Sequence, residues 1–393
     1  MQGRRPKQED RHVSIPDLAK AAKALKMPID HLDQPAAFFG VFDGHQGHLC
    51  AEFAAKSFHM KMLKKLAADK GALSESRGVA LLREVAEELD DEFLAKYRTA
   101  PDGCTMVVTL LLGTRLFVAW AGDSRCLLCR NTSAGELATV ALTSDHRPSM
   151  KYEAARVKKA GGVIVNFDGA LRVAHEGYED KVREIRRAQA QGLGTIGKEP
   201  VALAVTRSLG DRFFKAVTGK SLLIARPSVQ CIRLDKSHKF IALMCDGIPD
   251  VMRNEEAVFE LDFVRDEANP TKDVKEACGK LVQEAYKRGS QDNLTVVLVR
   301  FQWEVLPKPK EVSREVPKAA PKEVPKESQA KPSDAATDVP LPGESAVDAL
   351  KRKHEEQRKK EETVLESVEP AESSEPPAKA QKVDSASPGD KSL

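Results

Sequence analysis

Short apolar runs, rich in β-branched residues, recur along the chain between polar segments that contain glycine. Runs of this length and composition are typical of β-strands. They predict strands over residues 36–42, 105–112, 115–121, 125–130, 202–205, 240–245 and 294–301. The dipeptides Gly113-Thr114 and Gly122-Asp123 lie between consecutive runs and predict hairpin turns. The strands are therefore expected to follow one another in hairpin succession.

Longer segments repeat apolar residues every three or four positions, as amphipathic helices do. The pattern predicts helices over residues 51–68 and 80–97, a third after Ser149 as candidate N-cap and stopping at Gly161-Gly162, and a fourth from near Pro270 to Gly289. Short strands in hairpin succession together with paired helices predict an antiparallel α+β layered domain rather than a chain of βαβ units.

The composition changes sharply after Trp303, because residues 304–393 contain no aromatic residue, no Cys and no Met. Such a segment cannot bury enough apolar surface to offset the entropy lost on ordering. We therefore expect a folded domain over residues 1–303 and a disordered tail rich in Pro, Glu and Lys over residues 304–393. Residues 350–365 have the charge pattern of a transient helix. A docking segment and a merely solvating tail are both compatible with this composition.

The bulk composition is that of an ordinary globular protein. Of 393 residues, 41% are hydrophobic and 31% charged, and the formal net charge is +3. This nearly balanced charge predicts neither a nucleic-acid nor a membrane partner. The first residues are polar, so no signal peptide is expected, and no apolar run approaches the ~20 residues of a membrane span.

The cysteines carry little functional signal. The seven residues lack zinc-finger spacing, and Cys126 and Cys129 fall within an apolar run, which favours buried thiols in a reducing compartment. We expect a monomer in the cytoplasm. A nuclear location is the alternative, because the segment KRKHEEQRKK could act as a weak signal, although its interleaved acids favour a solvated helix.

Several carboxylates stand where a predicted strand runs into a turn. Asp43-Gly44-His45 and Asp246-Gly247 each follow an apolar run, Asp123 lies in a glycine turn, and Asp292-Asn293 precedes another run. Each Asp-Gly alone is typical of a plain turn. As a set, they predict an oxygen-rich cage that suits Mg²⁺ or Mn²⁺ rather than zinc.

These residues belong to nine segments that occur in a fixed order. They are QGRRPKQEDRH (2–12), VFDGHQG (41–47), DGCT (102–105), AGDSR (121–125), DHRPS (145–149), AGG (160–162), LAVTRSLGD (203–211), CDGIPDVM (245–252) and GSQDNLTVV (289–297). Together the segments resemble the ordered motifs of the type 2C protein phosphatases, the metal-dependent serine/threonine phosphatase family. The resemblance covers residues 1 to about 303.

The resemblance implies a fold and a set of metal ligands. The fold would be an antiparallel β-sandwich with a pair of helices outside each sheet, an α/β/β/α arrangement. The implied ligands bind two Mg²⁺ or Mn²⁺ ions and a third, weaker one: Asp43 bridges the first two, Gly44 lends its carbonyl oxygen, Glu9 reaches the second ion, Asp246 and Asp292 complete the first site, and Asp123 and Asp250 match the weaker site.

The resemblance also implies two catalytic residues and a reaction. Arg5 matches the arginine that binds phosphate, and a forked guanidinium can hold two phosphate oxygens at once. His45 matches the proposed general acid, which would protonate the leaving serine or threonine oxygen. A cation pair lowers the pKa of a shared water, so a bridging hydroxide would attack phosphorus directly. The expected substrates are phosphoproteins.

Some residues near these motifs are expected to serve the structure only. Asp10 and Asn293 would brace neighbouring loops, Arg207 would stabilise a local turn, and Cys104 would lie in the core. Pro249 lacks the backbone N–H that other residues offer next to Asp250, which weakens the third metal site.

The chain departs from the family pattern at two further places. Met1 opens directly onto the first motif, which predicts a shortened first strand or a fragment of a longer chain. The connection between Val173 and Leu203 is long, with an insertion at about 174–200. Its charge spacing favours a helix with a solvated face, and the alternative is a substrate-recognition flap.

Two other classes of function remain open at this level. The chain could be a catalytically silent relative that acts as a scaffold, although Glu9, Asp43, Asp246 and Asp292 are all retained. It could instead be another metal phosphohydrolase, acting on nucleic acid or on a small metabolite. The lack of an aromatic and basic groove disfavours nucleic acid.

Overall fold

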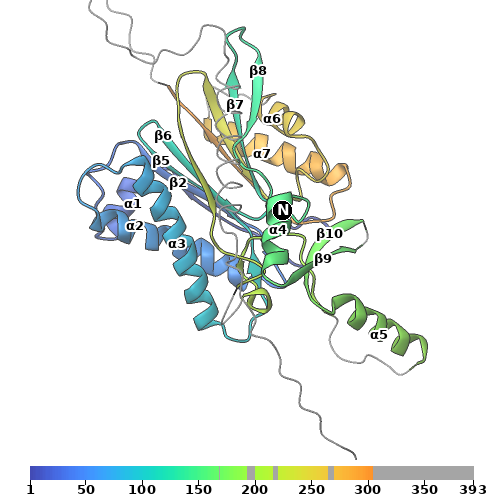
Figure 1. The fold of residues 1–393 in the computed structure, drawn as a ribbon. Coiled ribbons are helices and arrows are strands. Elements are labelled where there is room, and N and C mark those ends of the chain that lie inside the picture. Colours follow the sequence, from blue (N-terminus) through green and yellow to red (C-terminus); the bar gives the residue numbers. More distant parts are fainter. Residues whose placement is uncertain (168, 193–199, 216–219, 264–269, 304–393) are drawn as a thin grey trace, which may run out of the picture. The chain divides into compact units, whose positions relative to one another are not determined.

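The computed structural model describes residues 1–167, 169–192, 200–215, 220–263 and 270–303. The predicted tail over residues 304–393 and part of the insertion, residues 193–199, lie outside the described residues. Two antiparallel sheets dominate the fold (Figure 1).

The first sheet has five strands in the order β1-β2-β5-β6-β12. These strands are β1 (Arg11–Ile15), β2 (Ala36–Phe42), β5 (Met106–Leu112), β6 (Arg115–Ala121) and β12 (Ser228–Arg233). Each neighbouring pair is antiparallel, and the hairpin predicted at Gly113-Thr114 joins β5 to β6.

The second sheet has four strands in the order β14-β13-β7-β8, all antiparallel. These are β14 (Val296–Arg300), β13 (His238–Met244), β7 (Arg125–Asn131) and β8 (Leu137–Ala141). The turn at Gly122-Asp123 carries the chain from β6 in the first sheet to β7 in the second. The hairpin predicted there is therefore wrong, because β6 and β7 belong to different sheets.

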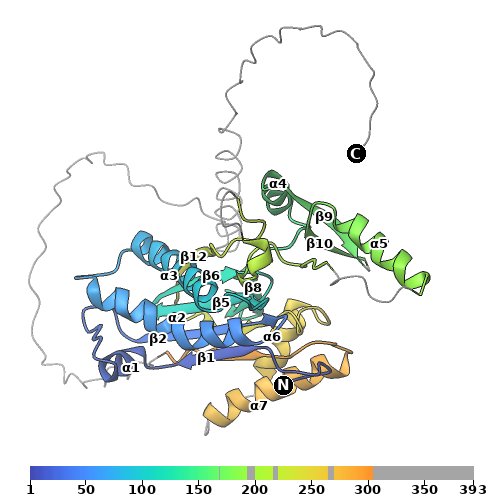
Figure 2. The same ribbon diagram turned by 90° about the horizontal axis from the view of Figure 1, so that it is seen from below.

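Helices cover the outer face of each sheet. The first sheet packs against α1 (Leu18–Ala24), α2 (Leu49–Ala68) and α3 (Glu75–Lys96), and the second against α6 (Asn254–Phe263) and α7 (Pro270–Lys287). Figures 1 and 2 show the strands between these two groups of helices. This arrangement is the predicted α/β/β/α sandwich.

The central strands are apolar on both faces because both faces are buried. In β2 every residue is buried. Phe38 and Phe42 pack toward the helices, whereas Phe39 and Val41 pack toward the second sheet. This double burial explains why these strands read as continuous apolar runs in the sequence rather than as alternating ones.

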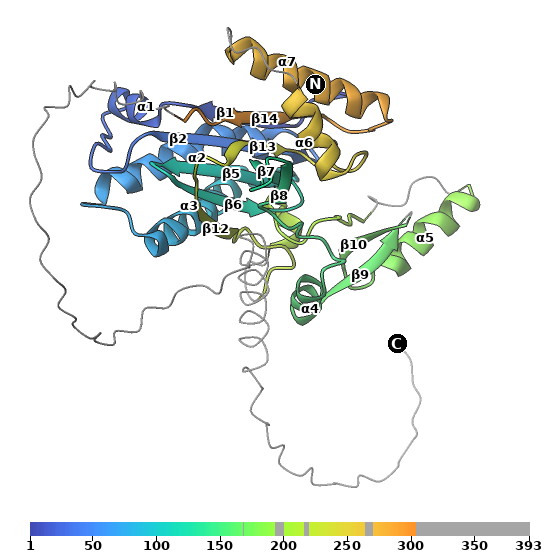
Figure 3. The ribbon, with the colours of Figure 1, turned by 90° about the horizontal axis from the view of Figure 1, so that it is seen from above.

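The remaining elements lie outside the two sheets. They comprise the three short strands β3 (Gly44–His45), β4 (Gly103–Cys104) and β11 (Leu209–Gly210), the hairpin of β9 (Gly162–Phe167) and β10 (Ala170–His175), the helices α4 (Lys151–Lys159) and α5 (Tyr178–Ala190), and the short 3₁₀ helix η1 (Arg212–Phe214). Figure 3 shows α4, α5, β9 and β10 beyond the ends of the sandwich strands. A separate apolar cluster that includes Val157, Val173 and Leu223 supports this part of the fold.

Two further details of the sequence interpretation need correction. Residues 202–205 form no strand, and only one isolated bridge joins Leu203 to Val173. The N-cap of α4 is Met150 rather than Ser149, and its side chain makes no capping hydrogen bond. The insertion does contain a helix, α5, whose surface is mostly exposed, as the charge spacing predicted.

Candidate active site

Four of the predicted aspartates stand at the same end of the two sheets. Asp43 directly follows β2, and Asp123 follows β6 in the turn between the sheets. Asp246 comes two residues after β13, and Asp292 lies in the loop that leads into β14. Because neighbouring strands are antiparallel, the end of β13 lies beside the start of β14, at Met244 and Val296. The rigid sheets therefore aim these side chains at one region.

Asp10, Asp43 and Cys245 form a close group, with potential ligand atoms that all lie within 4.8 Å of one another. Asp10 is buried, and its Oδ2 accepts a hydrogen bond of 2.7 Å from Thr295. Its Oδ1 has no hydrogen-bond partner in the described part of the chain. The bracing role predicted for Asp10 is thus seen on one oxygen, and the other is a buried acceptor beside Asp43.

Negative charge accumulates in this region beyond what the neighbouring cations neutralise. Burial, followed by the charges of Asp246 and Asp10, holds the pKa of Asp43 well above its ordinary value. Burial, followed by Asp123 and Asp250, does the same to the pKa of Asp246. Carboxylates that raise one another's pKa in this way are stabilised by a cation between them. The donor set is nearly all oxygen, which fits a hard divalent ion.

One arginine reaches into the acidic group from the DHRPS motif. The Arg147 Nε donates to Asp123 over 2.9 Å, and its second guanidinium nitrogen lies 3.2 Å from Asp250 and 3.8 Å from Asp246. Asp123 is almost fully buried, whereas the side chain of Asp250 is 51% exposed. The two aspartates predicted for a third metal site are therefore brought together around a guanidinium.

The N-terminal segment lies against the loop that carries Asp292. The Met1 nitrogen donates to the Leu294 oxygen over 2.7 Å, and the Leu294 N–H donates back over 2.9 Å. Gly3 has a φ of +64°, and a Cβ there would stand 2.0 Å from the Asp292 carbonyl oxygen, so no other residue fits. Arg5 then meets the Asp292 side chain at 2.7 Å.

Asn293 fixes this N-terminal segment, which confirms the bracing role predicted for it. Its side-chain nitrogen donates to the carbonyl oxygens of Gln2 and Lys7 over 2.8 and 2.9 Å. Its side-chain oxygen accepts the Glu9 N–H over 2.8 Å. The buried amide of Asn293 therefore sets the backbone that positions Arg5 and Glu9.

Gly44 lies where backbone of the N-terminal segment comes very close. A Cβ at this position would be 2.6 Å from the Glu9 carbonyl oxygen. A glycine therefore lets Glu9 and the Asp43-Gly44 turn approach one another, as the predicted shared site requires. Glu9 also lies within electrostatic range of His45.

His45 is paired with an aspartate that sequence reasoning left without a role. Its Nε2 lies 2.8 and 2.9 Å from the two carboxylate oxygens of Asp211, which is fully buried. Burial alone would lower the pKa of His45, but the charge and hydrogen bonds of Asp211 outweigh burial and raise the pKa. Ser208 donates its hydroxyl to the same carboxylate over 2.5 Å. Asp211 therefore favours the protonated imidazolium.

The residues for which the sequence predicted structural roles are buried or paired with neighbouring segments. Cys104 is buried with its sulfur 3.5 Å from that of Cys50, and Cys126 and Cys129 are buried as predicted. Arg207 pairs with Glu153 of α4 and donates to the Arg226 carbonyl oxygen, so it ties local segments together.

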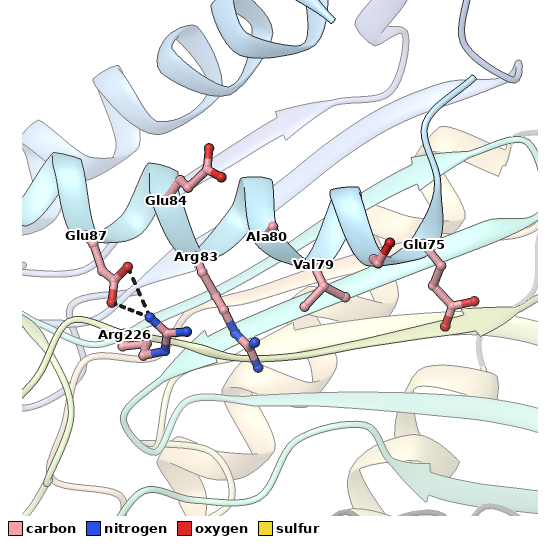
Figure 4. Close-up of a pocket in the computed structure, with 8 residues that line it drawn as sticks. Glu75, Val79, Ala80, Arg83, Glu84, Glu87 and Arg226 are labelled. Carbon is pink, nitrogen blue, oxygen red and sulfur yellow. Dashed lines mark hydrogen bonds and ion pairs between the residues drawn. The ribbon is translucent and has the colours of Figure 1, made fainter. Parts of the chain in front are cut away.

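The described surface has two hollows of note. A hollow of about 540 Å³ adjoins the acidic group, and its lining includes Arg125, Asp250 and Arg253. A second, of about 650 Å³, lies on α3 and is lined by none of the predicted site residues. Figure 4 shows that Arg226 closes an ion pair with Glu87 in this second hollow. Of these two hollows, the first alone is lined by a predicted site residue, Asp250.

Comparisons with known proteins agree with this geometry. The family model described as protein phosphatase 2C matches residues 1–294. An integrin-linked kinase-associated serine/threonine phosphatase 2C from Bos taurus is 30% identical over 312 residues, covering 76% of this chain and 74% of that protein. A probable protein phosphatase 2C 45 from Oryza sativa subsp. japonica is 33% identical over 275 residues, covering 70% of this chain and 80% of that protein.

A solved structure shares the fold. The crystal structure of a serine-threonine phosphatase 2C from Toxoplasma gondii matches with a TM-score of 0.59 at 23% identity, over 76% of this chain and 92% of the other. Fold, matched family and named relatives together define a protein serine/threonine phosphatase. The chain belongs to the protein phosphatase 2C family.

This membership decides between the classes of function that the sequence left open. The named relatives are serine/threonine phosphatases, which favours an enzyme over a silent scaffold and a phosphoprotein substrate over nucleic acid or a metabolite. Within the described residues, no helix combines the length and apolar character needed to cross a membrane.

Proposed function

We propose that the protein removes phosphate from phosphoserine and phosphothreonine in proteins and that it requires Mg²⁺ or Mn²⁺, two ions with a third, weaker one. The observation that carries this proposal is the convergence of Asp43 and Asp246, which follow strands of opposite sheets: after burial, the charge of Asp246 is the main cause that raises the pKa of Asp43. Two carboxylates that repel each other in this way are poised to share a cation.

The residues present fit such ions. Asp43, Asp246, Asp292, Glu9 and the Gly44 carbonyl oxygen would hold the two stronger ions. When bound, the ions would supply Lewis-acid stabilisation of phosphate charge and a water of lowered pKa for in-line displacement. Cys245 also lies in the group with Asp10 and Asp43, but burial and these two nearby carboxylates raise the pKa of its thiol, which favours the protonated form. We therefore assign the ligand role to oxygens alone.

Arg5 would bind the phosphate group of the substrate. Its side chain is 55% exposed, and the guanidinium pairs with Asp292 through one nitrogen only. The remaining donors of the guanidinium are suited to two phosphate oxygens in a fork geometry. Because Asn293 fixes the backbone on both sides of Arg5, this group is held near the carboxylates before substrate binds.

His45 would hold the proton that the leaving serine or threonine oxygen needs. Burial alone would lower the pKa of the imidazole, but the charge and hydrogen bonds of Asp211 raise it above its ordinary value, which favours the protonated form that a general acid needs. A serine or threonine alkoxide is a poor leaving group, whereas p-nitrophenolate is a good one. His45→Ala should therefore slow hydrolysis of a phosphothreonine peptide more than that of p-nitrophenyl phosphate.

The test is a phosphate-release assay with purified full-length protein on three substrate classes. We expect Mn²⁺- or Mg²⁺-dependent release from a phosphothreonine peptide, little from DNA or small aliphatic esters, and loss of release with EDTA. Equal release with EDTA would overturn the metal requirement. Faster release from DNA or a small ester than from the peptide would overturn the substrate class.

A further inference from the structure

Arg147 occupies the centre of the carboxylates that would form the weaker cation site. Its guanidinium contacts Asp123 at 2.9 Å and Asp250 at 3.2 Å, and Asp246 lies 3.8 Å away. One fixed positive charge thus faces three carboxylates. A divalent ion bound by the same oxygens would stand where the guanidinium now lies, and two cations cannot share that space.

The backbone around Arg147 is fixed rather than free. The preceding His146 donates its backbone N–H to the Gly122 carbonyl oxygen over 2.9 Å, and its Nδ1 accepts the Gly122 N–H over 3.2 Å. The Met150 N–H donates to the Arg147 carbonyl oxygen over 3.0 Å. These bonds hold Arg147 next to the Gly122-Asp123 turn, so its side chain begins beside its main partner.

Arg147 shares an acidic neighbour, Asp145, with a second arginine, Arg125. Asp145 accepts two hydrogen bonds from Arg125, at 2.9 and 2.8 Å, and also lies 3.7 Å from the Arg147 Nε. Arg125 in turn donates to Asn254 over 3.0 Å. Arg125 is therefore an equally charged neighbour whose hydrogen bonds and ion pairs within the described residues go to Asp145 and Asn254 rather than to Asp123 or Asp250, which makes it a matched control.

We propose that Arg147 is an internal cation that competes with a divalent ion for Asp123 and Asp250 and so sets the affinity of the weaker site. The inference rests on the proposed metal-dependent function. It gives Arg147 a positioning and selectivity role: the guanidinium offsets part of the charge of these carboxylates, and an ion binds there only when the guanidinium withdraws.

The direct test is a titration of the full-length protein with Mn²⁺, measured by isothermal titration calorimetry. Compared with the unmodified chain, Arg147→Gln should bind the weakest Mn²⁺ about tenfold more tightly or more, because a competing charge within 4 Å is gone. Arg147→Lys should give a smaller gain, because an ammonium retains the charge but cannot bridge both carboxylates. Arg125→Gln should give the smallest change.

A double variant locates the effect. Adding Asp123→Asn to Arg147→Gln should abolish the gain, because the added affinity comes from Asp123. Thermal unfolding gives a second readout: in EDTA the Arg147→Gln protein should melt lower than the unmodified chain, and saturating Mn²⁺ should raise its melting temperature by more. This readout also shows whether the variant is folded.

The outcomes separate this inference from the proposed function. If the unmodified chain binds Mn²⁺ and releases phosphate, but Arg147→Gln titrates identically or no better than Arg125→Gln, the role of Arg147 is refuted and the function stands. If the unmodified chain binds no Mn²⁺ and releases no phosphate, the function itself fails, and the inference fails with it.

Discussion

Glu153 of α4 is a buried carboxylate whose removal should loosen the part of the fold beside the active site. Its side chain is fully buried and pairs with Arg156 at 3.0 Å and with Arg207 at 2.7 Å. Arg156 also donates to the Leu222 carbonyl oxygen over 2.9 Å. The carboxylate therefore ties α4 directly to Arg207, and it also pairs with Arg156 of the same helix, which contacts the Leu222 segment.

The magnitude follows from the pKa of Glu153. Burial alone would raise this pKa, but Arg207 and Arg156 outweigh burial and lower it to about 2, from an ordinary value of 4.5. At 1.36 kcal/mol per pKa unit, ionised Glu153 contributes about 3 kcal/mol to the free energy of unfolding at pH 7. Because the folded-state pKa is lowered, this contribution is present above pH 4.5 and is lost as the pH falls toward 2.

The perturbation is Glu153→Gln, whose amide resembles the protonated acid. Urea unfolding at pH 7 should give a free energy of unfolding about 3 kcal/mol below that of the unmodified chain. The difference should shrink to about half by pH 3, since the unmodified chain then loses the same ionisation. Amide hydrogen exchange should accelerate most in α4.

The matched control is Asp180→Asn, which breaks an exposed pair with Arg183 in the neighbouring helix α5. Exposed pairs of this kind contribute little. The reasoning would be refuted if Glu153→Gln changed the free energy of unfolding at pH 7 by less than about 1 kcal/mol. A difference that stayed constant from pH 7 to pH 3 would refute the pKa argument specifically.

Three further predictions concern the active site. Asp43→Asn should lower phosphate release by at least about a hundredfold with unchanged circular dichroism, because it removes a negative charge from the proposed cation pair; near-normal turnover of p-nitrophenyl phosphate would exclude the ligand role. Asp211→Asn should lower the pKa of His45, which Asp211 raises, so the alkaline limb of the kcat/KM profile on a phosphothreonine peptide should move to lower pH; an unchanged limb would show that it does not report the ionisation of His45. Saturating Mn²⁺ should raise the melting temperature above that in EDTA, because an ion that binds only the folded state stabilises it; equal melting temperatures would contradict the cation centre.

The features that sequence could predict are those encoded by local pattern. Asp43 and Asp246 follow continuous apolar runs, so their placement at strand ends could be read directly. Strands β2 and β6 have the predicted bounds because both of their faces are buried. By contrast, β1 is a five-residue strand whose alternate exposed residues gave too short a signal.

Contacts between distant parts of the chain could not be predicted in the same way. Asp211 lies 166 positions from His45, and Arg147 lies 103 positions from Asp250. Both residues stand in motifs that the resemblance had marked, LAVTRSLGD and DHRPS. Their place in these motifs was the only sign in the sequence that they have a role, because pairing across such separations is decided by topology. The same holds for the turn at Gly122-Asp123, where the local pattern of a hairpin is identical to that of a passage between sheets.

The division of the acidic residues between two sheets has a consequence for how the enzyme matures. Asp43 is supplied by one layer and Asp246 by the other. A half-assembled chain with only one layer in place would present only part of the proposed ligand set and would hold a cation weakly. Capture of the proposed cations should therefore accompany the docking of the layers, and manganese in the medium should favour the completed fold over its folding intermediates.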